Sequence, residues 1–307
     1  MELSLFSKVR NKILKGKYLY IMLTPGLILM ILFRYFPMGG LIIAFKDYSF
    51  RKGIWGSDWV GLKNFIFIFT QNPDFFNILR NTLVINILKL IFYFPTPIIL
   101  ALLINEIHGN KLKRGIQTAV YLPHFVSWVV FGTIVTQFLS PSTGVVNRII
   151  EFFGGQPVFF MQESRYFWGV VIISEIWKSA GWGTIMYLSA LTSIDQELYH
   201  AAKIDGANAL QCVRHISLPG ISDTIVVLLL LQIGQMMDVS FDQMYVLAKP
   251  VVYDVGDVLS TYIFRIGIGQ AQFDMTTAIG MFQSVVGLIL ITSANFVCKR
   301  LFDKTLW

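Results

Sequence analysis

Residues 193–219, SIDQELYHAAKIDGANALQCVRHISLP, form a mostly polar connection between two long apolar runs, residues 166–191 and 221–241. Each run is long enough for a helix that crosses the roughly 30 Å of hydrocarbon in a bilayer, which takes about 20 residues. Two such runs joined by a short polar connection are typical of neighbouring membrane spans. The pattern therefore predicts an all-α integral membrane protein, with this connection at one membrane surface.

Within the connection, the pattern predicts a helix, a break and a second helix. Ser193 can cap the first helix, and Ala201 and Ala202 place a face of small residues along it. Gly206 stops this helix, because glycine adopts the left-handed turn that other residues resist. A second short helix follows, and Pro219 ends it. Small side chains let another surface approach closely, so this bent pair suits a lever that receives force from a cytoplasmic partner.

The composition also favours a bilayer. Hydrophobic residues make up 55% of the 307 residues, charged residues only 14%, and the mean hydropathy is +0.62, whereas a soluble domain carries about 25% charged residues. The net charge of +7 comes without a dense basic patch interleaved with aromatic residues, which argues against nucleic-acid binding. Cys212 and Cys298 are too far apart for a metal-binding motif or a disulfide framework.

The sequence contains six apolar runs that can each cross the membrane as a helix. Helices are required because hydrocarbon offers no partner to backbone groups, and the alternating pattern of a membrane barrel is absent. The basic residues within 1–17, followed by a long apolar run without a cleavage site, indicate a retained signal anchor. The predicted spans are residues 18–45, 82–105, 118–139, 166–191, 221–241 and 276–297.

The distribution of basic residues orients these spans. Thirteen Lys and Arg residues, against six acidic ones, lie in the tails and alternate loops at residues 1–17, 106–117, 193–220 and 298–307. Nine, against ten acidic residues, lie in the other loops at residues 46–81, 140–165 and 238–275. Because cytoplasmic loops hold the excess of Lys and Arg, both termini are predicted to be cytoplasmic, in a multi-pass protein of the cell membrane.

The first two spans are interrupted by polar residues and prolines. The first contains Arg34 and Pro37, and the second contains Lys89, Pro95 and Pro97. Proline removes a backbone hydrogen bond and bends a membrane helix. Bent helices leave room between them, which suits a transport pathway. Kinks that packing merely tolerates are the alternative.

The connection resembles the EAA loop of binding-protein-dependent ABC importer permeases. The match covers Ala201-Ala202-x-x-Asp205-Gly206-Ala207 and then Ile216-x-Leu218-Pro219. Two positions differ: His200 stands where the family usually has glutamate, and Val213 where it often has phenylalanine. Glu197 lies one turn earlier and can partly substitute. The resemblance implies docking into a groove on the ATP-hydrolysing subunit, through Glu197, His200, Ala201, Ala202, Asp205, Gly206, Ala207, Leu218 and Pro219.

Other segments resemble the subgroup of these permeases that imports oligosaccharides or polysaccharide fragments. They are residues 37–48 (PMGGLIIAFKDY), 81–83 (NTL), 121–125 (YLPHF), 241–247 (FDQMYVL) and 260–264 (STYIF). The resemblance implies a type I ABC importer permease (MetI-like) fold. It also implies four kinds of partner: a second, different permease subunit, ABC ATPase subunits, an extracellular solute-binding protein and a carbohydrate substrate.

Motifs for catalysis are absent from the sequence. It has no Gly-x-x-x-x-Gly-Lys-Ser/Thr for ATP, and no His-Glu-x-x-His, Gly-x-Ser-x-Gly or Cys-x-x-Cys. The four histidines are scattered. The chain is therefore predicted to have no catalytic residues, no metal site and no cofactor. Under the resemblance, ATP and Mg bind to the partner subunits.

Polar residues at membrane depth are costly and indicate functional positions. Glu175 and Lys178 lie three residues apart in the fourth span and can neutralise each other on one face. Sugars bind through hydrogen bonds and aromatic faces, which Trp and Tyr supply. Helix packing of the amides and interface anchoring of the aromatics are the alternatives. The residues predicted to line a carbohydrate pathway are Glu175, Trp177, Lys178, Trp182, Tyr187, Gln232, Gln235 and Asp238.

The predicted organisation has three parts. The first, residues 1–79, holds an N-terminal cytoplasmic tail, the first membrane helix and an external loop. The second, residues 80–302, is the permease domain with its 193–220 loop. The third, residues 303–307, is a C-terminal tail. The predicted function is the permease subunit of an ATP-driven importer of oligosaccharides or polysaccharide fragments. An ion-gradient-driven secondary transporter is the alternative, although such proteins usually show inverted repeats and none is visible here.

Overall fold

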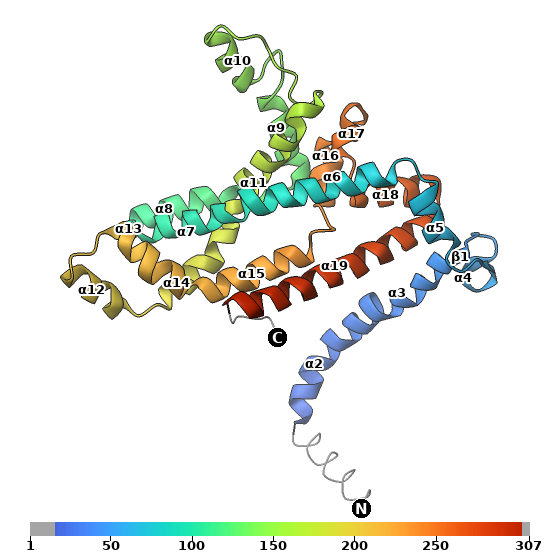
Figure 1. The fold of residues 1–307 in the computed structure, drawn as a ribbon, viewed down its shortest axis with the longest axis horizontal. Helices are drawn as coiled ribbons and strands as arrows, with labels where there is room; N and C mark the ends of the chain where they lie inside the picture. The colour runs from blue at the N-terminus through green and yellow to red at the C-terminus, as the bar shows by residue number, and fades with distance from the viewer. Residues whose placement is uncertain (1–15, 303–307) are drawn as a thin grey trace, which may run out of the picture.

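The computed structural model describes residues 16–302, so the predicted tails at 1–15 and 303–307 lie outside the described residues. Most of the described chain is helical (Figure 1). One small antiparallel sheet, the only sheet in residues 16–302, pairs β1 (Lys46–Asp47) with β2 (Asp58–Trp59). Two short helices flank it, α4 (Gly53–Gly56) and α5 (Lys63–Thr70).

The first span is one continuous helical segment, Lys17–Phe45, of 29 residues. Only 6% of its most apolar window is buried against the rest of the chain. Figure 1 shows its α2 part (Lys17–Met30) apart from the bundle, whereas η2 (Gly39–Phe45) at its end packs against α19 (Phe273–Phe302). Its hydrogen-bonding pattern changes along its length, to a π-helical turn before Pro37 and a 3₁₀ segment after it. Its parts are α2 (Lys17–Met30), η1 (Ile31–Tyr35), α3 (Phe36–Met38) and η2 (Gly39–Phe45).

The second span, Phe75–Asn105, begins seven residues before the predicted start at 82. The extra residues include the polar Asn77, Arg80 and Asn81, which hydrophobicity alone would not assign to a span. Pro95 and Pro97 do not break it, because the first helical positions need no backbone N–H and the π-helical turn just before them absorbs the irregularity. Its parts are α6 (Phe75–Leu88), η3 (Lys89–Tyr93) and α7 (Pro95–Asn105).

The third span is sharply bent, so the prediction of one uninterrupted helix over 118–139 was wrong. The segments Asn110–Phe125 and Trp128–Phe138 meet at 103°. The chain becomes extended at Val126 and Ser127, directly after the 3₁₀ turn that contains Pro123. Ser127 then caps the next helix by accepting from the Val130 backbone N–H at 3.4 Å. The parts are α8 (Asn110–Tyr121), η4 (Leu122–Phe125) and α9 (Trp128–Phe138).

The fourth span, α11 (Ser164–Thr192), is a single helix of 29 residues and confirms the predicted 166–191. A short helix, α10 (Val145–Phe152), precedes it. α11 contacts helices from the second, third and fifth spans and α16 and α17 beyond them. It is therefore the central helix of the bundle.

The fifth span is shorter than predicted. Its helix, α15 (Ser222–Gly234), ends before residue 235 rather than at 241. The irregular segment that follows is held by side chains of two other helices. Asn86 Nδ2 donates to the Met236 carbonyl at 2.9 Å, and Ser260 Oγ donates to the Val239 carbonyl at 2.9 Å. The chain then continues through α16 (Phe241–Leu247), η6 (Pro250–Val252), α17 (Tyr253–Gly256) and α18 (Leu259–Gln270). Residues 238–275 are thus largely helical, and α16 packs against α9, α11 and α18.

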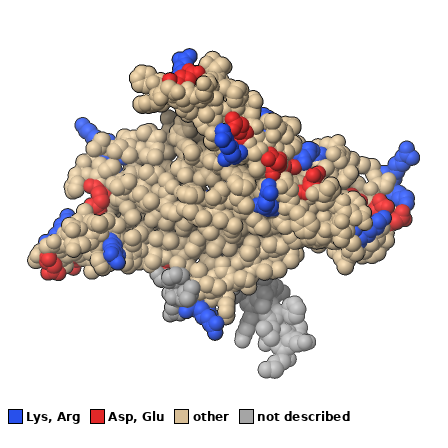
Figure 2. All heavy atoms as spheres, turned by 45° about the horizontal axis from the view of Figure 1, so that its top comes forward, with Lys and Arg blue, Asp and Glu red and all other residues tan. Residues whose placement is uncertain are grey.

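The last span is α19 (Phe273–Phe302), which packs along α15 and α18. By length and composition, three helices in residues 16–302 can cross a membrane: Lys17–Phe45, Phe75–Asn105 and Phe273–Arg300. Two bent pairs raise this number to five: Asn110–Phe125 with Trp128–Phe138, and Ala209–Gly220 with Ser222–Gly234. α11 has the length of a span but carries Glu175 and Lys178 in its middle. On the face shown in Figure 2 the body of the bundle is broadly uncharged.

Candidate functional site

The 193–220 loop lies at one end of the bundle, opposite β1, α4 and α5 (Figure 1). It contains the predicted helix, break and helix. The first helix is α12 (Gln196–Ile204), and the second is a continuous segment of α13 (Ala209–Cys212), η5 (Val213–Ser217) and α14 (Leu218–Gly220). Pro219 does not end this second segment, because it occupies the first turn of α14, where a missing N–H is tolerated. The change of direction falls at Ile221.

Gly206 makes the break, as predicted. Its φ is +81°, a left-handed value at which a side chain would be strained. The turn is closed by backbone hydrogen bonds, from Ala207 N–H to the Ala202 carbonyl at 2.9 Å and from Gly206 N–H to the Lys203 carbonyl at 3.1 Å. The turn therefore fixes the direction of the second helix relative to the first, which a flexible link would not do.

The caps of the two helices differ from the prediction. Asp195, not Ser193, caps α12, because its Oδ1 accepts from the Glu197 N–H at 2.9 Å. The second helix has a capping box: Asn208 Oδ1 accepts from Gln211 N–H at 2.9 Å, and Gln211 Oε1 accepts from Asn208 N–H at 2.8 Å. Both helices therefore begin at fixed positions, and the second begins directly after the Gly206 turn.

Two contacts tie the loop to its base. The hydroxyls of Tyr199 and Ser217 lie 3.0 Å apart and join α12 to the second helix. Gly220 gives Ile194 room, since a Cβ there would come within 2.5 Å of its Cδ1. A movement imposed on α12 would consequently reach the start of the fifth span.

The outer surface of the loop is exposed and partly apolar. α12 has no buried residue, and Leu198, Ile204 and Leu210 are 54%, 86% and 76% exposed. A hollow of about 330 Å³ lies beside the turn, lined by Ala202, Asp205, Gly206, Ala207, Gln211, Cys212, His215 and Ile216. Glu197, His200 and Ala201 are also exposed. Apolar side chains displayed around a concave turn of fixed shape suit contact with another protein.

Lys178 does not pair with Glu175, contrary to the prediction. Its ammonium group donates to the carbonyls at the α8–α9 bend, those of His124 at 2.9 Å, Val126 at 2.5 Å and Pro123 at 3.4 Å. The Pro123 carbonyl also accepts from the Val126 backbone N–H at 3.3 Å, whereas the His124 and Val126 carbonyls lie at the break, where helical partners run out. Lys178 therefore fastens the bend to α11, and its donors are occupied by the chain itself.

Glu175 pairs with a residue of the second span. Lys89 Nζ lies 3.3 Å from Glu175 Oε2, and the two side chains are 8% and 13% exposed. Lys89 Nζ also donates to Gln243 Oε1 at 3.0 Å. A buried polar cluster thus joins the second span, α11 and α16. Neither Lys89 nor Gln243 was among the predicted pathway residues.

The aromatic residues predicted for the pathway lie in two different settings. Trp182 stacks on the His124 imidazole, with ring centroids 4.6 Å apart and planes within 2°, and it contacts Phe125 edge-on. Trp182 is 46% exposed and Phe125 is 71% exposed, so this stack faces outward from the chain. Tyr187, in contrast, is only 2% exposed and packs among apolar side chains of the core.

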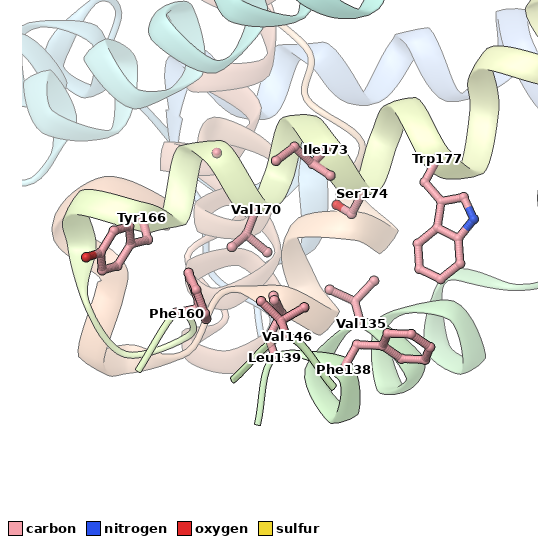
Figure 3. A pocket seen from close by; sticks show the side chains of 11 residues that line it. Val135, Phe138, Leu139, Val146, Phe160, Tyr166, Val170, Ile173, Ser174 and Trp177 are labelled. Atoms are coloured by element: carbon pink, nitrogen blue, oxygen red, sulfur yellow. The ribbon is translucent and has the colours of Figure 1, made fainter. Parts of the chain in front are cut away.

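Trp177 lines a separate cavity between α9 and α11 (Figure 3). Its indole contacts the Phe131 ring at a centroid distance of 4.8 Å. The cavity has a volume of about 400 Å³, and apart from Ser174 and Tyr166 it is lined by apolar residues: Val135, Phe138, Leu139, Val146, Phe160, Gly169, Val170, Ile173 and Trp177. An apolar lining supplies few of the hydrogen bonds that a sugar requires.

The remaining predicted pathway residues lie at the end of the fifth span. Gln232 is in the last turn of α15, and Gln235 and Asp238 lie in the irregular segment after it. Gln235 and Asp238 are exposed. This segment and the second span are joined by the Asn86 hydrogen bonds described above. Among residues 16–302, no three His, Cys, Asp or Glu side chains are grouped so that they could hold a metal ion.

Residues 93–306, more than half of the chain, match a family described as "Binding-protein-dependent transport system inner membrane component". The chain belongs to this family. The permease is 45% identical to the protein LplB of Bacillus subtilis strain 168, over 94% of this chain and 91% of LplB. It is 44% identical to the polygalacturonan/rhamnogalacturonan transport system permease protein YteP of the same strain, over 96% of this chain and 92% of YteP.

The fold of the permease agrees with a solved structure. It matches a chain from the crystal structure of a bacterial ABC transporter involved in the import of the acidic polysaccharide alginate. The TM-score is 0.88 and the sequence identity is 40%, and the match covers 96% of this chain and 99% of that one. A second structure of that transporter contains an alginate pentasaccharide-bound periplasmic protein. The predicted type I ABC importer permease fold is therefore confirmed.

Sequence reasoning missed Lys89, Gln243, His124 and Phe125. Lys89 carried a usable signal, because it is a charged residue inside an apolar run. Gln243 lies beyond the predicted end of the fifth span, so its signal was its place in the 241–247 segment that resembles the oligosaccharide-importing subgroup. The significance of His124 and Phe125 depends on the bend, which sequence periodicity does not reveal.

Proposed function

We propose that this permease is one of two membrane subunits of an ATP-driven importer that takes up fragments of an acidic polysaccharide. The observation that carries the proposal is the 193–220 loop, a rigid helix–turn–helix with exposed apolar side chains at one end of a membrane bundle. A loop of this kind needs a partner, and the family to which the chain belongs works with binding proteins. The substrate class is supported by two relatives: one is named as a polygalacturonan/rhamnogalacturonan transport permease, and the other belongs to a transporter that imports alginate.

In this proposal the loop is cytoplasmic, as are both termini, and it docks on a separate ATPase subunit that binds ATP and Mg. The docking residues are Glu197, His200, Ala201, Ala202, Asp205, Gly206, Ala207, Leu218 and Pro219. Nucleotide binding would move the loop, and the Tyr199–Ser217 contact would carry that movement into the fifth span. This coupling requires that nucleotide favours one conformation of the membrane subunits over the other.

The proposed substrate pathway runs past α11 and the end of α15. Trp182 and Phe125 offer aromatic faces to the C–H surfaces of a sugar ring, and Gln232, Gln235 and Asp238 offer hydrogen-bonding groups. Glu175 belongs to the pathway through its pair with Lys89, whereas Lys178 supports it by holding the α8–α9 bend. Trp177 and Tyr187 contribute to packing on either side. A solute-binding protein would deliver the oligosaccharide from outside.

Purification of the complex tests the proposal. The tagged chain is expressed in its own host cells, extracted in detergent and purified through the tag. We expect a second permease, an ATPase subunit and, in reconstituted vesicles, ATP hydrolysis that increases when the solute-binding protein is loaded with a uronate oligosaccharide. The panel comprises trisaccharides of galacturonate, mannuronate and guluronate, each with its neutral methyl ester. Absence of an ATPase subunit, or uptake that persists without ATP and collapses with the ion gradient, would instead favour a secondary transporter.

A further inference from the structure

Lys89 is a buried cation at membrane depth. It begins the π-helical turn in the middle of the second span, and the residue is only 6% exposed. A lysine in this position is costly unless its charge is paired. Its ammonium group meets Glu175 Oε2 at 3.3 Å and Gln243 Oε1 at 3.0 Å. The pair joins residues that are 86 positions apart in the chain.

Gln243 holds this lysine in one place. The amide is fully buried, and its Nε2 donates to the Val171 carbonyl at 2.8 Å and to Ser174 Oγ at 3.2 Å, both on α11. With the nitrogen committed to α11, the oxygen is turned toward Lys89. The ammonium group therefore has a fixed position beside Glu175.

Within residues 16–302, Glu175 makes an ion pair with Lys89 and with no other cation. Three charged residues lie near the middle of the second and fourth spans, Lys89, Glu175 and Lys178, and Asp238 lies beyond the end of α15. Lys178 is committed to the carbonyls of the α8–α9 bend. Asp238 is exposed and makes no ion pair within residues 16–302. Removing Lys89 would leave Glu175 without an ion-pair partner within residues 16–302 and would make the charge around it more negative by one unit.

We propose that Lys89 is a specificity-determining residue: by neutralising Glu175 it allows a carboxylate-bearing oligosaccharide to pass a pathway that would otherwise repel it. This inference rests on the proposed function. Two like charges about 7 Å apart, at an effective dielectric constant of about 20, repel enough to change an equilibrium by more than tenfold. A neutral sugar experiences no such repulsion. Lys89 thus affects acidic substrates selectively, unlike a residue that only braces the helices.

The experiment compares charge variants in the reconstituted transporter. The variants are Lys89→Met, Glu175→Gln and the double substitution, with Lys52→Met as the matched control in the exposed hairpin, where Lys52 pairs with Asp58. Each is assayed for ATP hydrolysis stimulated by the binding protein loaded either with the uronate trisaccharide that stimulates the parent most or with its methyl ester. Each rate is divided by the parent rate for the same ligand, so preferences of the binding protein cancel.

We expect Lys89→Met to lower the acidic-ligand rate about tenfold more than the ester rate. The quantity compared is the ratio of the acidic-ligand rate to the ester rate. The double substitution restores the ratio of the parent, because it removes both charges together. Glu175→Gln raises the ratio, and Lys52→Met leaves it unchanged. Equal losses with both ligands in Lys89→Met, or no loss, would overturn the proposal and assign Lys89 to bracing.

Glu175→Gln keeps the test decisive if Lys89→Met fails to accumulate. It leaves the Lys89 charge unpaired, so a ratio above that of the parent supports charge balancing, and a parent-like ratio refutes it. Failure of the proposed function is seen separately, in the parent: if no acidic trisaccharide stimulates its ATP hydrolysis, the substrate class is wrong and this inference falls with it.

Discussion

At the scale of single residues, Gly206 shows how one backbone angle shapes an exposed surface. Its positive φ reverses the chain between α12 and α13, and no Cβ clash forces the choice of glycine, since a side chain there would meet nothing within 4 Å. The constraint is therefore conformational rather than steric. Small neighbours, Ala202 and Ala207, line the hollow beside the turn.

Gly206→Ala is expected to uncouple the transporter while leaving its insertion intact. The left-handed conformation costs a non-glycine residue about 1–2 kcal/mol, which would shift the turn and misplace the exposed face of α12. Substrate-stimulated ATP hydrolysis in vesicles should fall severalfold, at an unchanged amount of protein in the membrane. Gly115→Ala is the control, because Gly115 in α8 has ordinary helical geometry and open space around it. Parent-like coupling in Gly206→Ala would argue against a role for the turn.

At the scale of elements, the α8–α9 bend distinguishes this fold from a bundle of six straight helices. A broken helix exposes carbonyls that hydrocarbon cannot satisfy, and Lys178 supplies the missing donors from α11. Gly181, one turn further along α11, lets the helix approach the Val120 carbonyl so closely that an added Cβ would overlap it. The bend is therefore held by a charge and a close backbone contact together, and it presents Phe125 and His124 beside Trp182.

Lys178→Met is expected to destabilise the bend. Each hydrogen bond from a charged group contributes about 1.5–3 kcal/mol, so losing the donor to these carbonyls should lower the apparent Tm of the purified complex by roughly 5 °C or more. Lys111→Met is the matched control, since Lys111 is exposed at the start of α8. An unchanged Tm for Lys178→Met would show that the bend holds without its lysine.

At the scale of the whole molecule, the permease leaves two apolar surfaces uncovered by its own chain. The first span is almost unburied within the chain, and the 193–220 loop displays apolar side chains at one end. Monomeric proteins rarely leave such surfaces uncovered. The bundle thus has the surfaces expected of a subunit, one facing lipid or a second permease and one facing a water-soluble partner.

Cysteine labelling tests the orientation proposed for this assembly. The background has Cys212 and Cys298 replaced by Ala. Single cysteines are introduced at Arg51, between β1 and β2, and at Lys111, at the start of α8 near the 193–220 loop. Both positions are exposed. A membrane-impermeant maleimide should label Arg51→Cys in intact cells and Lys111→Cys only after permeabilisation. The reverse pattern would place the 193–220 loop outside and contradict ATPase docking.

The sequence by itself determined the properties that depend on local composition and spacing. Apolar runs of the right length predicted the spans, because the bilayer acts on each segment separately. The 193–220 loop was predicted as a helix, break and helix because capping and glycine geometry act over three or four residues. The resemblance to importer permeases rested on this same local spacing.

Only the tertiary structure decided which charges pair and where spans break. Glu175 and Lys178 looked like a local pair, yet Glu175 meets Lys89, 86 residues away, and Lys178 meets carbonyls 52–55 residues away. A carboxylate or an ammonium group in a medium of low dielectric takes the partner that the packing of helices brings to it. The bend at 103° and the early end of α15 arose in the same way, since donors from other helices satisfied the freed backbone groups.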